Sequence, residues 1–197
     1  MSSTATHGAL RAVVGLAALL NLLWFGVEFA VGHVIGSVSL FADSIDFLED
    51  AALNFLILVA VGWSARNRAR VGMLLAGLLL VPGVTTLATA WQKVAAPVAP
   101  DAALLSWTGV GALVVNLSCA LMLTRYRHHR GSLTRAAFLS ARNDALANVA
   151  IVAAGLVTAW APSAWPDLAV GLGIAAMNAG ACREVWRAAR GEYHDDD

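Results

Sequence analysis

The chain consists mostly of long apolar runs that are separated by short polar connections. Each run is about 20 residues long, the length that an α-helix needs to cross a hydrocarbon core of roughly 30 Å. No run shows the strict apolar and polar alternation that is typical of a half-buried strand. The pattern therefore predicts six membrane-spanning helices, at Leu10–Val31, Val38–Val61, Val71–Ala90, Leu104–Leu123, Ala136–Ala159 and Leu168–Val185.

These runs take up nearly the whole chain, so we expect an all-α, polytopic membrane protein. Residues 1–190 form one six-helix transmembrane domain in this interpretation, and residues 191–197 form a polar C-terminal tail. The connections are too short to fold as separate domains. The first run is longer than the apolar region of a signal peptide, so we expect it to be retained.

Composition and charge agree with a membrane protein and indicate its orientation. Hydrophobic residues make up 59% of the chain and charged residues 13%, with a formal net charge of zero, which argues against a nucleic-acid partner. Lys and Arg near span ends remain cytoplasmic. Apart from Arg142, inside the fifth run, only Lys93 falls on the opposite side from the other basic residues. Those are Arg11, Arg66, Arg68, Arg70, Arg125, Arg127, Arg130, Arg135, Arg183, Arg187 and Arg190. Both termini are therefore predicted to be cytoplasmic, in an inner or plasma membrane of the bacterial type.

Four tryptophans lie near span ends on the predicted outer side, where an indole favours the headgroup zone. They are Trp91, Trp107, Trp160 and Trp165. We interpret them as interfacial anchors; the alternative is a stacking site for an aromatic ligand. Cys119 and Cys182 both fall inside predicted helices, so we expect buried thiols rather than a disulfide, with a metal thiolate as the alternative.

The second run carries carboxylates in its middle. A carboxylate at the centre of a spanning helix costs roughly 2.5–3.5 kcal/mol of insertion free energy. Asp46 and Asp50 therefore must be protonated, paired or bound to an ion. At 100° per residue they share an arc of about 80° with Asp43 and Asn54, and they lie one turn apart. Both can therefore reach one divalent ion. The alternatives are a polar helix packed on other polar helices, or a pairing with Arg142.

The fifth run supplies complementary groups. Asn148 follows Asp144 by one turn and Ser140 precedes it by one turn, so all three can face one side. Arg142 lies on the opposite face, where we expect it to reach the cytoplasmic interface or to pair with Glu49. In the six-span topology, Asp50 and Asp144 lie within about one helical turn of the same depth.

Three carboxylates with nearby amide and hydroxyl oxygens suit a divalent cation. The predicted ligands are Asp46, Asp50 and Asp144, with Ser140, Asn148 or water in a further position. A proton relieves the repulsion between close carboxylates, so protons and metal compete for the same oxygens. Two other classes stay open: a non-transporting intramembrane metal sensor or subunit, and an intramembrane hydrolase. We expect no enzyme, because no nucleophile accompanies the aspartates, and no permanent cofactor.

The same residues resemble the cation diffusion facilitator family. The resemblance rests on Asn21 and Glu28 in the first run and on Gly36-Ser37-x-Ser39-Leu40-Phe41-Ala42-Asp43-x-x-Asp46-x-x-x-Asp50 in the second. In that family the second and fifth helices each carry a pair of metal ligands four residues apart. Asp46 and Asp50 match the first pair and Asp144 matches the second member of the other, whereas Ser140 stands where the family usually has His or Asp.

This resemblance implies export of a divalent metal from the cytoplasm in exchange for protons, by a homodimer. It implies a short, transmembrane-only member, because the chain has no counterpart of the family's cytoplasmic metal-binding domain. Ser140 implies an oxygen-dominated site of broad selectivity, in which zinc, manganese, iron, cobalt and cadmium stay open.

Overall fold

The protein is described by a computed structural model that places residues 3–60, 83–124 and 132–192. This part of the chain contains helices and no strands, as the apolar pattern predicts. The helices are α1 (Ser3–Ile35), α2 (Val38–Ala60), α4 (Ala102–Thr124), α5 (Ser132–Trp160) and α6 (Trp165–Glu192). Residues 83–95 are also helical. The prediction of an all-α fold is confirmed.

Helix boundaries agree with the predicted runs, and most helices are longer than the run they contain. Among the described residues, two segments are long and apolar enough to cross a membrane, Arg11–Ile35 and Ala102–Met122. The apolar segment Asp144–Trp160 is shorter. α2 is not among these segments, and four acidic residues interrupt its apolar sequence. Most of the predicted span Val71–Ala90, including Pro82, lies outside the described residues, so the count of six spans stays a prediction.

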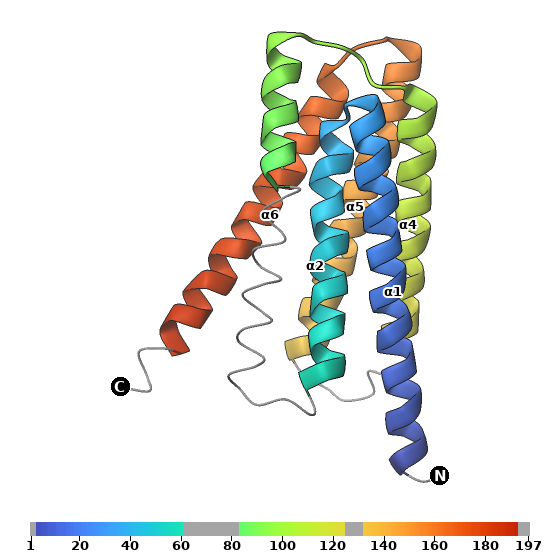
Figure 1. Ribbon diagram of the computed structural model, residues 1–197, viewed down its shortest axis with the longest axis vertical. Helices are drawn as coiled ribbons and strands as arrows, with labels where there is room; N and C mark the ends of the chain where they lie inside the picture. Colours follow the sequence, from blue (N-terminus) through green and yellow to red (C-terminus); the bar gives the residue numbers. More distant parts are fainter. Residues whose placement is uncertain (1–2, 61–82, 125–131, 193–197) are drawn as a thin grey trace.

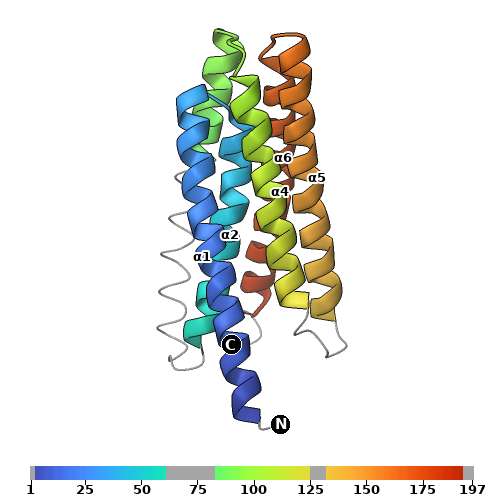
Figure 2. The ribbon, with the colours of Figure 1, turned by 90° about the vertical axis from the view of Figure 1, so that its right-hand side faces the viewer.

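The helices run along one another in an elongated bundle (Figures 1 and 2). α1 pairs with α2, α4 pairs with α5, and α2 contacts α1, α5 and α6. α1 begins and α6 ends at the lower end of Figure 1, while the connections at residues 36–37, 96–101 and 161–164 lie at the opposite, upper end. The lower half of α6 leans away from α2 (Figure 1). α2 is therefore the helix that contacts α1, α5 and α6 in the interior of the bundle.

The turn between α1 and α2 is built by local sequence. Gly36 has a φ of 62°, a left-handed conformation that only glycine adopts without strain, and the N–H of Ser37 donates to the carbonyl of Gly32 at 2.9 Å. The hydroxyl of Ser37 then accepts from the N–H of Leu40 at 3.2 Å, which caps the start of α2. This geometry sets where α2 begins and hence the depth of each of its carboxylates.

A buried polar cluster, which we call the upper clamp, holds this turn to α6 and to the helix at residues 83–95. It consists of Ser37, Ser39, Lys93 and Asp167. The ammonium of Lys93 donates to Asp167 Oδ2 at 2.6 Å, and both side chains are almost fully buried. The hydroxyls of Ser37 and Ser39 each donate to Asp167 Oδ1 at 2.6 Å.

Asp167 also caps α2 from another helix. Its carboxylate accepts from the backbone N–H groups of Val38 at 2.9 Å and Ser39 at 3.1 Å, which have no partner inside α2. A negative charge is favourable at this helix end. Burial by itself would raise the pKa of Asp167, but the charge of Lys93 and the hydrogen bonds from Lys93, Ser37 and Ser39 lower that pKa below its ordinary value.

Apolar packing continues from the clamp into the bundle. A Cβ at Gly171 would lie 2.6 Å from the carbonyl carbon of Val38, so the absence of a side chain allows α6 to touch the backbone of α2. Below this contact a core cluster joins α2, α4, α5 and α6. Its members are Leu40, Ala42, Leu105, Ala147, Ile151, Ala154 and Ile174.

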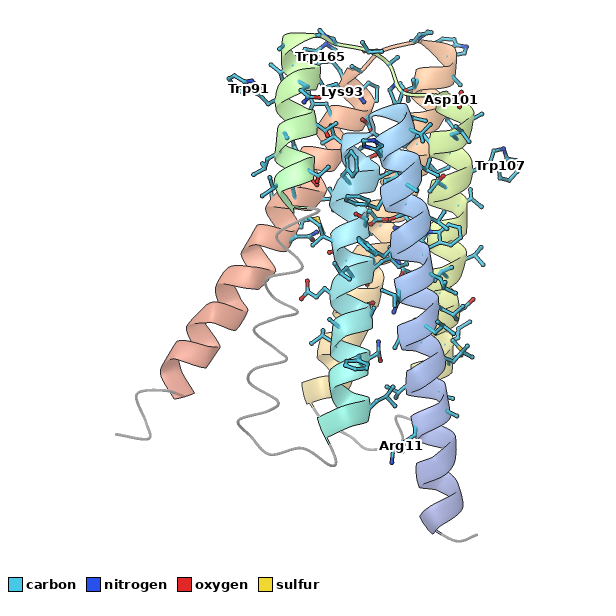
Figure 3. All side chains as sticks on the ribbon, in the orientation of Figure 1. Arg11, Trp91, Lys93, Asp101, Trp107 and Trp165 are labelled. Carbon is cyan, nitrogen blue, oxygen red and sulfur yellow. The ribbon has the colours of Figure 1, made fainter. Side chains whose placement is uncertain are left out.

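The four tryptophans that we interpret as anchors are all exposed. Figure 3 places Trp91, Trp107 and Trp165 toward the upper end and Arg11 near the lower end. This distribution agrees with a lipid-facing surface whose upper end lies at an interface.

Candidate cation site

The acidic face of α2 points into the bundle. Asp43 is fully buried, and Asp46 and Asp50 are partly buried. From Asp43 to Asp50 the helix rises about 10.5 Å and completes nearly two turns, so these carboxylates lie on one stripe at different depths. Because α2 starts at the upper end, Asp43 is the uppermost of the three.

Asp144 approaches this stripe from α5, which contacts α2. The charge of Asp50 acts most strongly on Asp144, followed by those of Asp43 and Glu49. Asp46 in turn feels the charges of Asp43, Asp144, Glu49 and Asp50. The structure thus brings Asp46, Asp50 and Asp144 close enough for their charges to act on one another, and their role as ligands stays a prediction.

Asn148 belongs to a different part of this interior. Its amide nitrogen donates to Asp43 Oδ2 at 2.8 Å, and its amide oxygen accepts from Asn116 at 3.3 Å. The amide orientation follows from chemistry, because an ionised carboxylate only accepts hydrogen bonds. The sequence pattern groups Asn148 with Asp144 as a candidate ligand, and in the structure the carboxylate partner of Asn148 is Asp43.

Other predicted groups are placed as follows. Asn54 donates to the backbone carbonyl of Asp50 at 2.8 Å, so its amide is bonded within its own helix. Glu49 is partly buried on α2. The side chains of Ser140 and Arg142 lie outside the described residues, and so does that of Cys182. Cys119 is a free, buried thiol, as expected.

The aspartates do not form a finished coordination sphere. Within the part of the chain that the structure describes, no three His, Cys, Asp or Glu side chains are grouped closely enough to hold one metal ion. Oxygen ligands sit about 2.0–2.6 Å from a divalent cation, so carboxylates that share one must come nearly into contact. The arrangement is an acidic interior in which the side chains are not close enough to share one ion as they stand.

α1 contributes a carboxylate that the ligand prediction left out. Glu28 is fully buried, and both of its carboxylate oxygens lack a hydrogen-bond partner. Asp43 is its main charged neighbour, followed by Asp46. The indole nitrogen of Trp24, one turn away, lies near Glu28 without making a hydrogen bond. The sequence carried a weaker signal for Glu28, because it lies three residues before the end of the predicted run Leu10–Val31, where a carboxylate costs less than at the centre of a span.

The family to which the chain belongs agrees with this acidic interior. A family model described as the cation efflux transmembrane domain matches residues 14–190, nearly the whole chain. The chain therefore belongs to the cation efflux family, the cation diffusion facilitators that its second helix resembles, and it is a membrane protein. A search of curated proteins finds no significant match. The family consists of cation transporters rather than enzymes.

Proposed function

We propose that this cation transporter exports a divalent metal from the cytoplasm in exchange for protons, and that Asp46, Asp50 and Asp144 bind the transported ion. The observation that carries the proposal is the placement of these three partly buried carboxylates on α2 and α5, two helices in contact, inside a cation efflux domain. Several acidic groups held together away from water are costly unless a cation neutralises them. A divalent ion satisfies this requirement.

Exchange with protons has a physical reason. Carboxylates that lose their metal regain neutrality by taking up protons, so the site need not cross the membrane fully charged. Metal and protons compete for the same oxygens. Under this proposal, a proton gradient drives metal movement in the opposite direction.

Ligand chemistry supports broad selectivity. The described ligands are carboxylates, which accept manganese and iron as well as zinc, and Ser140 would add an oxygen from α5. Asn148 donates to Asp43 and accepts from Asn116, so its amide is already engaged. We therefore assign it a supporting role in the proposed site.

Flux into proteoliposomes tests the proposal. Wild-type protein should move zinc and manganese faster across a pH gradient than without one. Asp50→Asn and Asp144→Asn should each lower metal flux by at least about tenfold, which corresponds to a loss of roughly 1.4 kcal/mol. Glu49→Gln is the matched control, since it removes a carboxylate from the same helix outside the proposed ligand set, and it should retain flux.

The same variants separate lost ligands from lost structure. Each substitution removes a charge from a repelling group, so the metal-free Asp50→Asn and Asp144→Asn proteins should be no less heat-stable than wild type. Normal flux in both variants would remove these aspartates from the transport site. Metal binding without flux in wild type would instead favour a sensor or subunit.

A further inference from the structure

Glu28 and Asp43 form a second acidic group, above the proposed transport site. Both side chains are fully buried, and they come from neighbouring helices, α1 and α2. Three of their four carboxylate oxygens have no hydrogen-bond partner: both of Glu28 and Oδ1 of Asp43. A buried polar atom without a partner is costly, and a charged one more so.

No described basic side chain neutralises this pair. In the described part of the chain the single ion pair joins Lys93 to Asp167, in the upper clamp. Among the described residues, the hydrogen bond to this pair comes from Asn148, which occupies Asp43 Oδ2. That bond leaves Asp43 Oδ1 free, and Asp43 is the charged group that acts most strongly on Glu28.

Glu28 and Asp43 lie too far from Asp50 to share an ion with it. Asp43 is about 4.5 Å above Asp46 and about 10.5 Å above Asp50 along α2, whereas ligands of one divalent ion lie within about 2.0–2.6 Å of it. Asn148 is likewise about 6 Å above Asp144 along α5. The interior therefore has an upper level with Glu28, Asp43 and Asn148 and a lower level with Asp50 and Asp144, and Asp46 lies between them.

We propose that Glu28 and Asp43 form a second divalent-cation site. Two carboxylates balance the charge of one such ion, and three of their four oxygens are free of hydrogen bonds. The all-oxygen donor set suits hard cations such as manganese, with water completing the coordination. Asp46, which feels the charges of both levels, lies between the two sites. The proposal goes beyond the transport site and does not require that the protein move ions.

Manganese binding to the purified full chain in lipid nanodiscs provides the test, with bound Mn²⁺ counted by loss of its free electron paramagnetic resonance signal. Wild type should bind about two Mn²⁺ ions per chain, one for each carboxylate group. Glu28→Gln should lose one ion. The double variant Asp50→Asn/Asp144→Asn should retain about one Mn²⁺ ion, bound by Glu28 and Asp43. The triple variant that adds Glu28→Gln should lose this ion as well. Glu49→Gln, the control, should bind as many ions as wild type.

A second pair of measurements keeps the inference testable if Glu28→Gln does not fold. Asp43→Asn should lose the same ion, and wild type should show magnetic broadening between two Mn²⁺ ions about 7 Å apart, the rise along α2 from Asp43 to midway between Asp46 and Asp50. Binding of one ion that Asp50→Asn/Asp144→Asn removes and Glu28→Gln leaves unchanged would overturn the second site. A proton shared by Glu28 and Asp43 would then explain their contact. Absence of flux would contradict the proposed function and leave this result intact.

Discussion

Asp167 is the most heavily bonded side chain among the described residues. Its carboxylate accepts from five donors: the hydroxyls of Ser37 and Ser39, the N–H groups of Val38 and Ser39, and the ammonium of Lys93. Removing one partner of a buried ion pair destabilises the fold more than replacing both partners by apolar residues, because the remaining charge stays buried. The clamp should therefore be sensitive at Asp167.

Asp167→Asn should lower the free energy of unfolding by about 3 kcal/mol, since Lys93 loses its counter-charge and one amide position can no longer accept. Equilibrium unfolding in mixed micelles measures this. Asp101→Asn is the matched control: Asp101 is exposed and caps α4 by accepting from Leu104 at 2.8 Å, and Asn caps helices equally well. Equal stability of the two variants would mean that the upper clamp contributes nothing.

The clamp also predicts an acid-dependent stability. The pKa of Asp167 is lowered on folding, so its contribution is complete above its unfolded pKa of about 3.9 and disappears as pH falls through the folded value. The stability difference between wild type and Asp167→Asn should therefore be constant near neutral pH and shrink below about pH 4. Thermal unfolding at a series of pH values measures it. A difference that stays constant into strong acid would contradict this linkage.

At the scale of elements, both local and distant residues cap the N-terminus of α2. Gly36 and Ser37 end one helix and begin the next by local rules that the sequence displays. Asp167 completes the same cap from more than a hundred residues away. An acidic residue at a predicted span end looks like an ordinary loop residue, so no sequence pattern could identify this role.

Two glycines on α6 test how this helix packs. Gly171→Ala places a methyl group against the backbone of Val38 and should cost about 2 kcal/mol of unfolding free energy. Gly173→Ala meets nothing within 4 Å, so it should be neutral or stabilising by up to about 1 kcal/mol, because Ala favours helix. Thermal unfolding of the two variants compares them directly. Equal destabilisation would show that α6 is rotated from this position.

The same two glycines bear on the homodimer, which stays a prediction. Gly171 packs against Val38 within the protomer, whereas a Cβ at Gly173 would meet none of the described residues within 4 Å, so this exposed position suits contact with a second copy. Loss of dimer in Gly173→Ala, seen by mass in nanodiscs at unchanged protomer stability, would locate the dimer contact on this face of α6.

At the scale of the whole molecule, orientation in the membrane follows from charge. α1 begins and α6 ends at one end of the bundle, the end near Arg11 (Figure 3), and the exposed tryptophans Trp91, Trp107 and Trp165 lie toward the other. Basic residues favour the cytoplasmic side. The lower end should therefore be cytoplasmic.

Cysteine labelling of intact cells checks this orientation in a variant without Cys119 and Cys182. Val98→Cys and Ala161→Cys, both exposed at the upper end, should react with an impermeant thiol reagent added outside. Gly8→Cys, at the lower end, should react only after the membrane is made permeable. Labelling of Gly8→Cys from outside would reverse the orientation and the direction of transport that we propose.

The sequence by itself determined the helices, and it drew attention to Asp46, Asp50 and Asp144. Helix formation and insertion depend on apolar length and on residues one turn apart, and both are local properties of the chain. The cost of a carboxylate in an apolar run is equally local. That cost is smaller for Glu28, which lies three residues from the end of its predicted run, so the sequence marks it less clearly than Asp46.

Only the tertiary structure decided which polar groups meet. Asn148 lies one turn from Asp144 in sequence, yet its amide bonds Asp43 on another helix, and Asp167 pairs with Lys93 across the bundle. Such pairings depend on the rotation and relative depth of packed helices. Rotation and depth are set by contacts between distant residues, such as Gly171 against Val38, which no local pattern records.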